Sequence, residues 1–226
     1  ITIPVGQTTA NSAPVPVRAD DAYAQGTQTL APVTITGTTG GNYEAVNTTG
    51  TINNTVVDDT DATTVTLTAS AGSVVEGNTI TYTATVTNAV TGSPLVVTLD
   101  NGTTITIPVG ATSATSAPVI VRADDVYAQG NTTVVRSITG TSGGNYEALT
   151  TTSTVSTNVT EDADATTVTL SSATNGTAIT EGGSIVYTAT VNNAVTGTPL
   201  VVTLSNGATI TIPVGQTTAN SAPVPV

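Results

Sequence analysis

The sequence predicts an all-β protein of tandem immunoglobulin-like antiparallel β-sandwich domains arranged as an extended rod. Three observations predict this fold class. Apolar residues alternate with threonines over many short stretches, no helical periodicity occurs, and the sequence repeats itself at intervals of about 104 residues. Alternation with a period of two is typical of half-buried strands. A repeat of this length matches a complete small domain rather than a short solenoid repeat.

The repeat is visible in long, nearly identical segments. ITIPVGQTTANSAPVPV occupies residues 1–17 and again 210–226, and a close variant occupies residues 105–121. RADDAYAQG at 18–26 returns as RADDVYAQG at 122–130. The chain is therefore a tandem array that begins and ends inside a repeat.

The limits of the repeats are expected where apolar alternation stops and acidic residues gather. This happens in VVDDTDA at 56–62 and in VTEDADA at 159–165. Three domains are predicted: the C-terminal part of one repeat at 1–60, a complete repeat at 61–162, and the N-terminal part of a third at 163–226.

Seven strands are expected in the complete repeat. They are 64–70, 79–88, 95–99, 104–109, 117–121, 132–139 and 150–159. Asp100-Asn101-Gly102 is a hairpin-turn signal between the third and the fourth. Seven short strands at this spacing are typical of an immunoglobulin-like sandwich, although the Cys and Trp hallmarks of antibody domains are absent.

Acidic residues are expected to converge at one end of each sandwich. In this topology the first, third and fifth turns and the segment after the last strand share an end. The candidate metal ligands of the complete repeat are Glu76, Asp100, Asp124, Asp125, Glu161, Asp162 and Asp164. The matching set at the first junction is Asp20, Asp21, Asp58, Asp59 and Asp61, and Glu181 represents the third repeat. Glu147 is expected at the opposite end, within reach of the preceding junction.

Clustered carboxylates repel one another unless a cation lies among them. All candidate ligands are hard oxygens and the chain has no His or Cys, which favours Ca²⁺ over Zn²⁺ or Cu²⁺. Flexible turns suit the variable coordination of Ca²⁺ better than the strict octahedron of Mg²⁺. The alternative is that the acidic turns only keep a surface soluble.

Composition excludes several classes of function. A net charge of −12 with three Arg and no Lys opposes binding to nucleic acid or to an anionic membrane. No apolar run is long enough for membrane insertion. Without His or Cys, the many Ser and Thr residues lack a base partner, so an enzyme is not expected.

The sequence resembles the extender repeats of giant bacterial adhesins of the repeats-in-toxin type. The resemblance rests on DADATTVTL, ITEGGSIVYTATV and the TITIPVG…RADDVYAQG run, and it covers essentially the whole chain. EG-x-x-I-x-Y with DD-x-Y also looks like the Calx-β pattern. The resemblance implies Ca²⁺ at the junctions, secretion to the bacterial cell surface, and a role in biofilm or surface attachment. Calx-β units usually carry Glu where this chain has Gln25 and Gln129, which weakens one implied ligand.

The leading hypothesis is a structural spacer that Ca²⁺ stiffens and that projects an adhesive tip. The expected partners are neighbouring repeats of the same chain and other copies of itself. Two alternatives stay open. One is a ligand-binding module, whose loops should differ between repeats and carry aromatic residues. The other is a subunit of a matrix filament, whose partial end domains are completed by strand addition from neighbouring chains.

Overall fold

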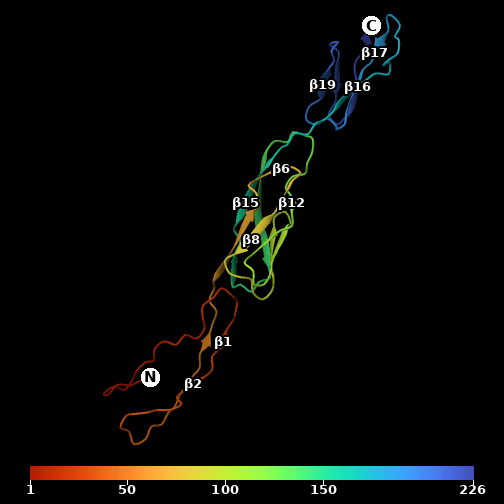
Figure 1. Ribbon diagram of the computed structural model, residues 1–226. Helices are drawn as coiled ribbons and strands as arrows, with labels where there is room; N and C mark the ends of the chain where they lie inside the picture. The colour runs from red at the N-terminus through yellow and green to blue at the C-terminus, as the bar shows by residue number, and fades with distance from the viewer. The chain divides into compact units, whose positions relative to one another are not determined.

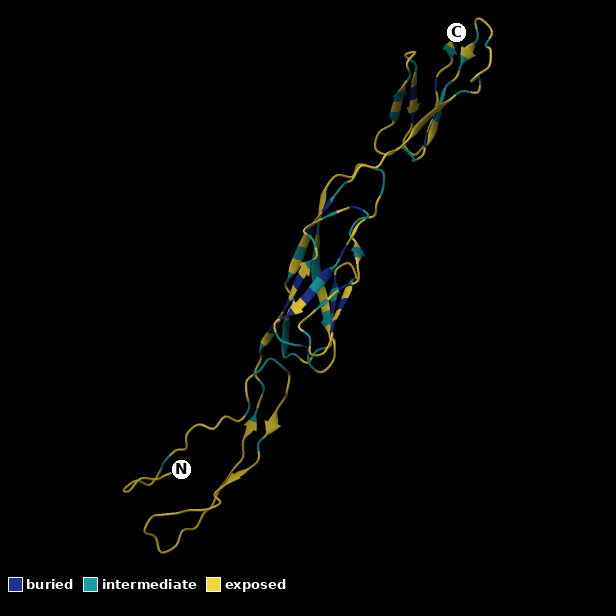
Figure 2. Cartoon of the chain, in the orientation of Figure 1, coloured by how far each residue is buried: buried dark blue, intermediate teal, exposed yellow.

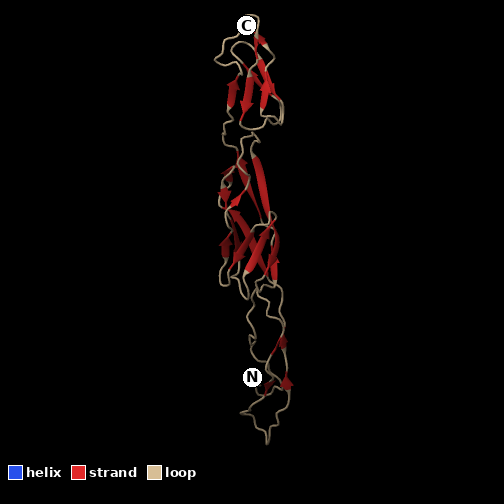
Figure 3. Cartoon of the chain, turned by 90° about the vertical axis from the view of Figure 1, so that its right-hand side faces the viewer, coloured by secondary structure: helices blue, strands red, loops and turns tan.

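The computed structural model describes residues 1–226 and contains strands and loops but no helix (Figure 3). Accordingly, it has no helix suited to crossing a membrane. Figure 1 shows the strands coloured in chain order. By contact, the chain divides into two compact units. Unit 1 comprises Ile1–Ser70, Thr81–Ala117 and Val135–Val155; unit 2 comprises Ala71–Ile80, Pro118–Val134 and Ser156–Val226. The repeat limits at 60 and 162 stay a prediction, because these units group residues by contact and not by sequence period.

Unit 1 contains a four-stranded sheet in the order β11-β8-β5-β14. Its strands are β5 (Ala62–Ala69), β8 (Tyr82–Val86), β11 (Ser113–Thr115) and β14 (Ala148–Thr150). The alternation in ATTVTLTA sends Val65 and Leu67 inward, where both are buried, while the intervening threonines face solvent. The sequence pattern therefore determines which face of this sheet is apolar.

The second sheet of unit 1 has the order β10-β9-β13, with β9 (Leu95–Leu99), β10 (Thr104–Ile107) and residues 138–142 of β13 (Thr132–Ser142). β9 and β10 form the predicted hairpin, and its turn contains Gly102 with a positive φ of 81°. Leu95, Val97, Ile105 and Ile107 are fully or almost fully buried. Figure 2 shows such buried residues along the strands of these sheets. The all-β sandwich prediction is confirmed.

Unit 2 contains strands whose sequences resemble those of unit 1. β16 (Val168–Ser171), β18 (Thr188–Val191) and β21 (Thr218–Asn220) form one sheet. β19 (Leu200–Thr203) pairs with β20 (Thr209–Ile212), and β17 (Ser184–Ile185) pairs with β22 (Val224–Pro225). Ala189, Val191, Ile210 and Ile212 form its apolar core.

Several strands differ from the sequence prediction. The stretch 79–88 is divided into β7 (Thr79–Ile80) and β8, and β12 (Val119–Ile120) starts only after Pro118, which has no amide to donate. Two pairings are parallel: β14 with β5 in unit 1, and β15 (Thr154–Thr160) with β6 (Ser73–Val75) in unit 2. The strands of the first 60 residues are short and form two pairs. These are β1 (Gln28–Thr29) with β4 (Thr55–Val56), and β2 (Val33–Thr34) with β3 (Thr51–Ile52).

Candidate metal centre

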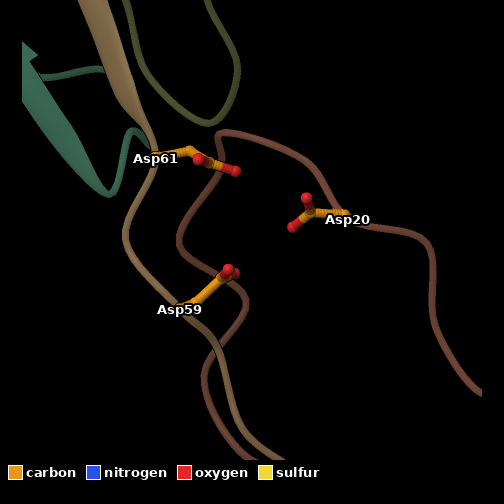
Figure 4. A group of neighbouring side chains, drawn as sticks. All are labelled: Asp20, Asp59 and Asp61. Atoms are coloured by element: carbon orange, nitrogen blue, oxygen red, sulfur yellow. The ribbon is translucent and has the colours of Figure 1, made fainter.

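Three aspartates meet in unit 1, at what is called here the first junction: the loop 18–26 and the acidic segment 56–62. The carboxylate oxygens of Asp20, Asp59 and Asp61 lie within 4.8 Å of one another. Figure 4 shows the three side chains directed into a common space between the two segments. Next to them is a hollow of about 110 Å³, which Glu147 also lines.

Three carboxylates also meet in unit 2, at the second junction, formed by Glu76, the loop 122–130 and the acidic segment 159–165. Glu76, Asp124 and Asp162 present oxygens within 4.8 Å of one another. Backbone hydrogen bonds fix the turn that carries Glu76: its own N–H donates to Thr160 O at 3.0 Å, and Gly77 N–H donates to Arg122 O at 3.0 Å.

The two groups occupy corresponding positions in the repeat. Asp20 corresponds to Asp124 in RADD, and Asp59 to Asp162 in the acidic segment. Asp61 corresponds to Asp164, which stands close enough to Asp162 and Asp124 for both charges to act on it. The structure therefore assembles a carboxylate group twice from the loop and the acidic segment, and at the second junction Glu76 joins it from a third segment.

An arginine lies beside each group. Arg122 pairs through Nε with Glu76 at 3.0 Å and through Nη2 with Glu161 at 2.5 Å. Its Nη1 donates to Gly130 O at 2.9 Å. Arg18 pairs in the same way with Asp58 at 2.5 Å and donates to Gly26 O. The sequence analysis did not single out these arginines, although Arg18 and Arg122 each directly precede the ADD of their own loop.

Other predicted ligands are held by protein donors. Asp125 accepts a hydrogen bond from Tyr127 N–H at 2.7 Å and another from Gln129 Nε2. Asp21 does the same with Tyr23 N–H at 2.8 Å and Gln25 Nε2. The glutamines that depart from the Calx-β pattern thus bind the loop aspartates. These aspartates order the loops that carry Asp20 and Asp124.

Asp100 and Glu181 belong to neither of the two carboxylate groups. Asp100 belongs to unit 1, where Arg136 Nη1 lies 3.5 Å from its carboxylate and Ser137 N–H donates to it at 3.3 Å. The arginine on β13 supplies its counter-charge, which the sequence pattern did not reveal. Glu181 is exposed and belongs to neither group.

The expectation that Glu147 reaches the preceding junction is confirmed. Asp61 N–H donates to Glu147 Oε2 at 2.6 Å. Glu147 follows the GGNY turn at the start of β14, so this contact ties that turn to the acidic segment 56–62.

The electrostatics of both groups show mutual repulsion. The charges of Asp59 and then Asp61 raise the pKa of Asp20, and the charges of Asp162 and then Asp124 raise the pKa of Asp164. Burial raises the pKa of Glu76, which is only 3% exposed, although Arg122 acts in the opposite direction. A cation would relieve all three effects. Oxygen-only donors drawn from loops fit Ca²⁺ in particular.

These shifts predict an unusual pH dependence for the metal-free protein. Because the pKa values of Asp20 and Asp164 are raised, the folded state binds protons more tightly than the unfolded chain, so stability increases as pH falls from 7 toward 4. The amides of Gln25 and Gly26 lower the pKa of Asp58, so its contribution is lost only below its ordinary value of 3.8. Melting curves of metal-free protein at several pH values should show a maximum a few degrees above the Tm at pH 7. A Tm that falls steadily from pH 7 downward would contradict this.

The comparisons with known proteins agree with this architecture. The family model described as the LapA domain matches residues 61–162 and again 164–225. A search of curated proteins finds no match. Because the two matched segments cover well over half of the chain and carry the repeated strands and acidic loops, the chain belongs to the LapA domain family, a family of adhesin repeats.

Proposed function

We propose that the chain is an extender segment of a bacterial cell-surface adhesin, in which Ca²⁺ bound at the junctions stiffens the array and helps to project an adhesive tip. The observation that carries this proposal is the recurrence of a carboxylate group at two junctions, in which Asp20 and Asp59 at the first correspond to Asp124 and Asp162 at the second. Each group combines a loop, RADD-x-Y, with an acidic segment that leads into the next repeat. A cation shared by both parts would hold that segment against the loop.

Family membership supports the adhesin part of the proposal. LapA is a large adhesin of Pseudomonas biofilms. A repeat of this family acts through its structure, with no catalytic group required, and its place is the cell surface or the extracellular medium. Attachment of cells to a surface or within a biofilm follows for the parent protein.

The residues that would hold the ion differ slightly between the junctions. At the first, Asp20, Asp59 and Asp61 provide the oxygens, with Glu147 close by. At the second, Glu76, Asp124 and Asp162 provide them, with Asp164 close by. When bound, Ca²⁺ supplies positive charge and six to eight coordination positions. By binding one ion together, the carboxylates of the loop and of the acidic segment would limit the movement of that segment.

The alternative of a ligand-binding module has less support. The cavities beside the first junction and beside Tyr127 have volumes of about 110 and 220 Å³. Sites for small molecules usually occupy at least about 300 Å³ and are lined by aromatic residues. The loops also barely differ between repeats, as RADDAYAQG and RADDVYAQG illustrate.

Thermal unfolding with and without Ca²⁺ tests the proposal. At a Ca²⁺ concentration of a hundred times Kd, one site adds about 2.7 kcal/mol to the free energy of unfolding. That corresponds to a rise in Tm on the order of 10 °C for the domain that holds the site. Mg²⁺ at the same concentration should have a much smaller effect, because it gives up its water ligands reluctantly.

A pair of variants provides the control. Asp124→Asn combined with Asp162→Asn should remove most of the Ca²⁺-dependent rise at the second junction, yet should leave the metal-free Tm equal or higher, because repulsion is relieved. Asp100→Asn should leave the Ca²⁺ response unchanged, since Arg136 already neutralises that carboxylate. Equal Ca²⁺ responses in the wild type and in the double variant would refute the proposed site.

A further inference from the structure

Two tyrosines meet at the first junction, beside the carboxylate group. Tyr23 belongs to the RADDAYAQG loop and Tyr146 to the GGNYE turn before β14. Their rings stack with centroids 5.8 Å apart and planes inclined by 28°. Burial raises the pKa of Tyr146, in keeping with a ring that packs against protein. Tyr146 therefore packs against the loop 18–26.

Hydrogen bonds fix both rings. Tyr23 OH donates to Ala89 O at 2.8 Å, and Tyr146 OH donates to Asn88 O at 2.8 Å. The backbones of the loop and the turn form an antiparallel bridge at the same place. In that bridge Ala24 N–H donates to Asn145 O at 3.1 Å, and Glu147 N–H donates to Ala22 O at 3.2 Å.

The turn can approach this closely only because of its glycines. Gly143 has a positive φ of 79°, and a Cβ on it would lie 2.1 Å from Pro94 O. Any other residue would push the turn away from Pro94 and would therefore displace Tyr146. The GG of GGNYE thus has a packing role that the proposed calcium site does not explain.

The second junction contains the counterpart of Tyr23 and of its hydrogen-bond acceptor. Tyr127 OH donates to Ala194 O at 3.0 Å, as Tyr23 OH does to Ala89 O. Next to Tyr127 is a cavity of about 220 Å³, lined by Ala194, Pro199 and Leu200. These residues correspond to Ala89, Pro94 and Leu95 in the repeat sequence. The residues that line this cavity therefore correspond to those that contact the GGNYE turn at the first junction.

We propose that consecutive repeats are joined by a tyrosine clasp that needs no cation. One repeat contributes the tyrosine of RADD-x-Y. The next repeat contributes the tyrosine of GGNYE and the two backbone carbonyls, here those of Ala89 and Asn88, that accept hydrogen bonds from the two tyrosine hydroxyls. None of these contacts involves a charged side chain. Because Tyr23 lies three residues after Asp20, the clasp also positions the loop that carries the carboxylates. It goes beyond the proposed function, since it holds a junction whether or not Ca²⁺ is bound.

Amide hydrogen exchange of the full 226-residue chain in chelator tests the clasp. In the wild type, the amides of Ala24 and Glu147 should be protected without metal, because both donate to backbone carbonyls of the bridge. Tyr146→Ala should reduce that protection by about tenfold or more, because one ring stack and one hydrogen bond are lost. Tyr23→Phe keeps the stack and loses only the bond to Ala89, so its effect should be smaller.

Tyr43→Ala is the matched control, because Tyr43 lies in the same GGNYE sequence motif but its side chain is 77% exposed. It should leave both amides unchanged, and the amide of Val97 in β9 should stay protected in every variant. Unprotected Ala24 and Glu147 amides in the metal-free wild type would overturn the clasp, as would unchanged protection in Tyr146→Ala. Failure of the calcium proposal would leave these results intact, because no metal is present.

Discussion

Replacing Arg122 with methionine is expected to lower the Tm of the metal-free protein by on the order of 10 °C. Arg122 is the counter-charge of Glu76, which is only 3% exposed, and it also binds Glu161 and Gly130 O. Removing one partner of a buried pair leaves the other charge without compensation, which is far more costly than losing a surface pair. Methionine keeps much of the apolar stem of the arginine side chain, so the decrease in Tm measures the loss of its charge and hydrogen bonds.

Calorimetry of two further variants separates this effect from a general loss of charge. Arg136→Met removes a comparably buried arginine, but its partner Asp100 is 34% exposed, so the loss in Tm should be small. Glu76→Gln added to Arg122→Met should restore part of the lost stability, because no buried charge then remains. Equal losses for Arg122→Met and Arg136→Met would show that Glu76 does not depend on Arg122.

Much of the fold could be predicted because the burial pattern is local. Alternation in ATTVTLTA and in TITI places every second residue inside, as β5 and β10 confirm. The turn after Leu99 was predictable from Asn101-Gly102. The division of 79–88 and the parallel pairings were not predictable, because they depend on contacts between strands that are distant in the sequence.

The carboxylate groups could be predicted in part, for a similar reason. Acidic residues that avoid strands must lie in loops, and repetition indicated which loops matter. Charge pattern alone could not show that Arg122 binds Glu76 or that Arg136 neutralises Asp100, since each pair is separated by more than thirty residues. The Tyr23–Tyr146 stack is likewise a contact between residues that are distant in the sequence.

Removing Ca²⁺ is expected to change the dimensions of the particle as well as its stability. If Ca²⁺ binds as proposed, it would hold the acidic segments 56–62 and 159–165 against their loops, and the junctions would resist bending. Without it, repulsion among the carboxylates would free these acidic segments, so that the array could bend even where a tyrosine clasp keeps the loop and the turn in contact. Its radius of gyration should decrease by roughly a tenth, because a flexible linker averages over more compact conformations.

Small-angle X-ray scattering of the same sample in Ca²⁺ and in chelator measures this most directly. The account predicts a longer maximal dimension with Ca²⁺, a more compact and flexible profile with chelator, and a constant molecular mass of one chain. A mass that grows with protein concentration would favour the filament alternative. Superimposable profiles in Ca²⁺ and in chelator would contradict the claim that calcium stiffens the junctions.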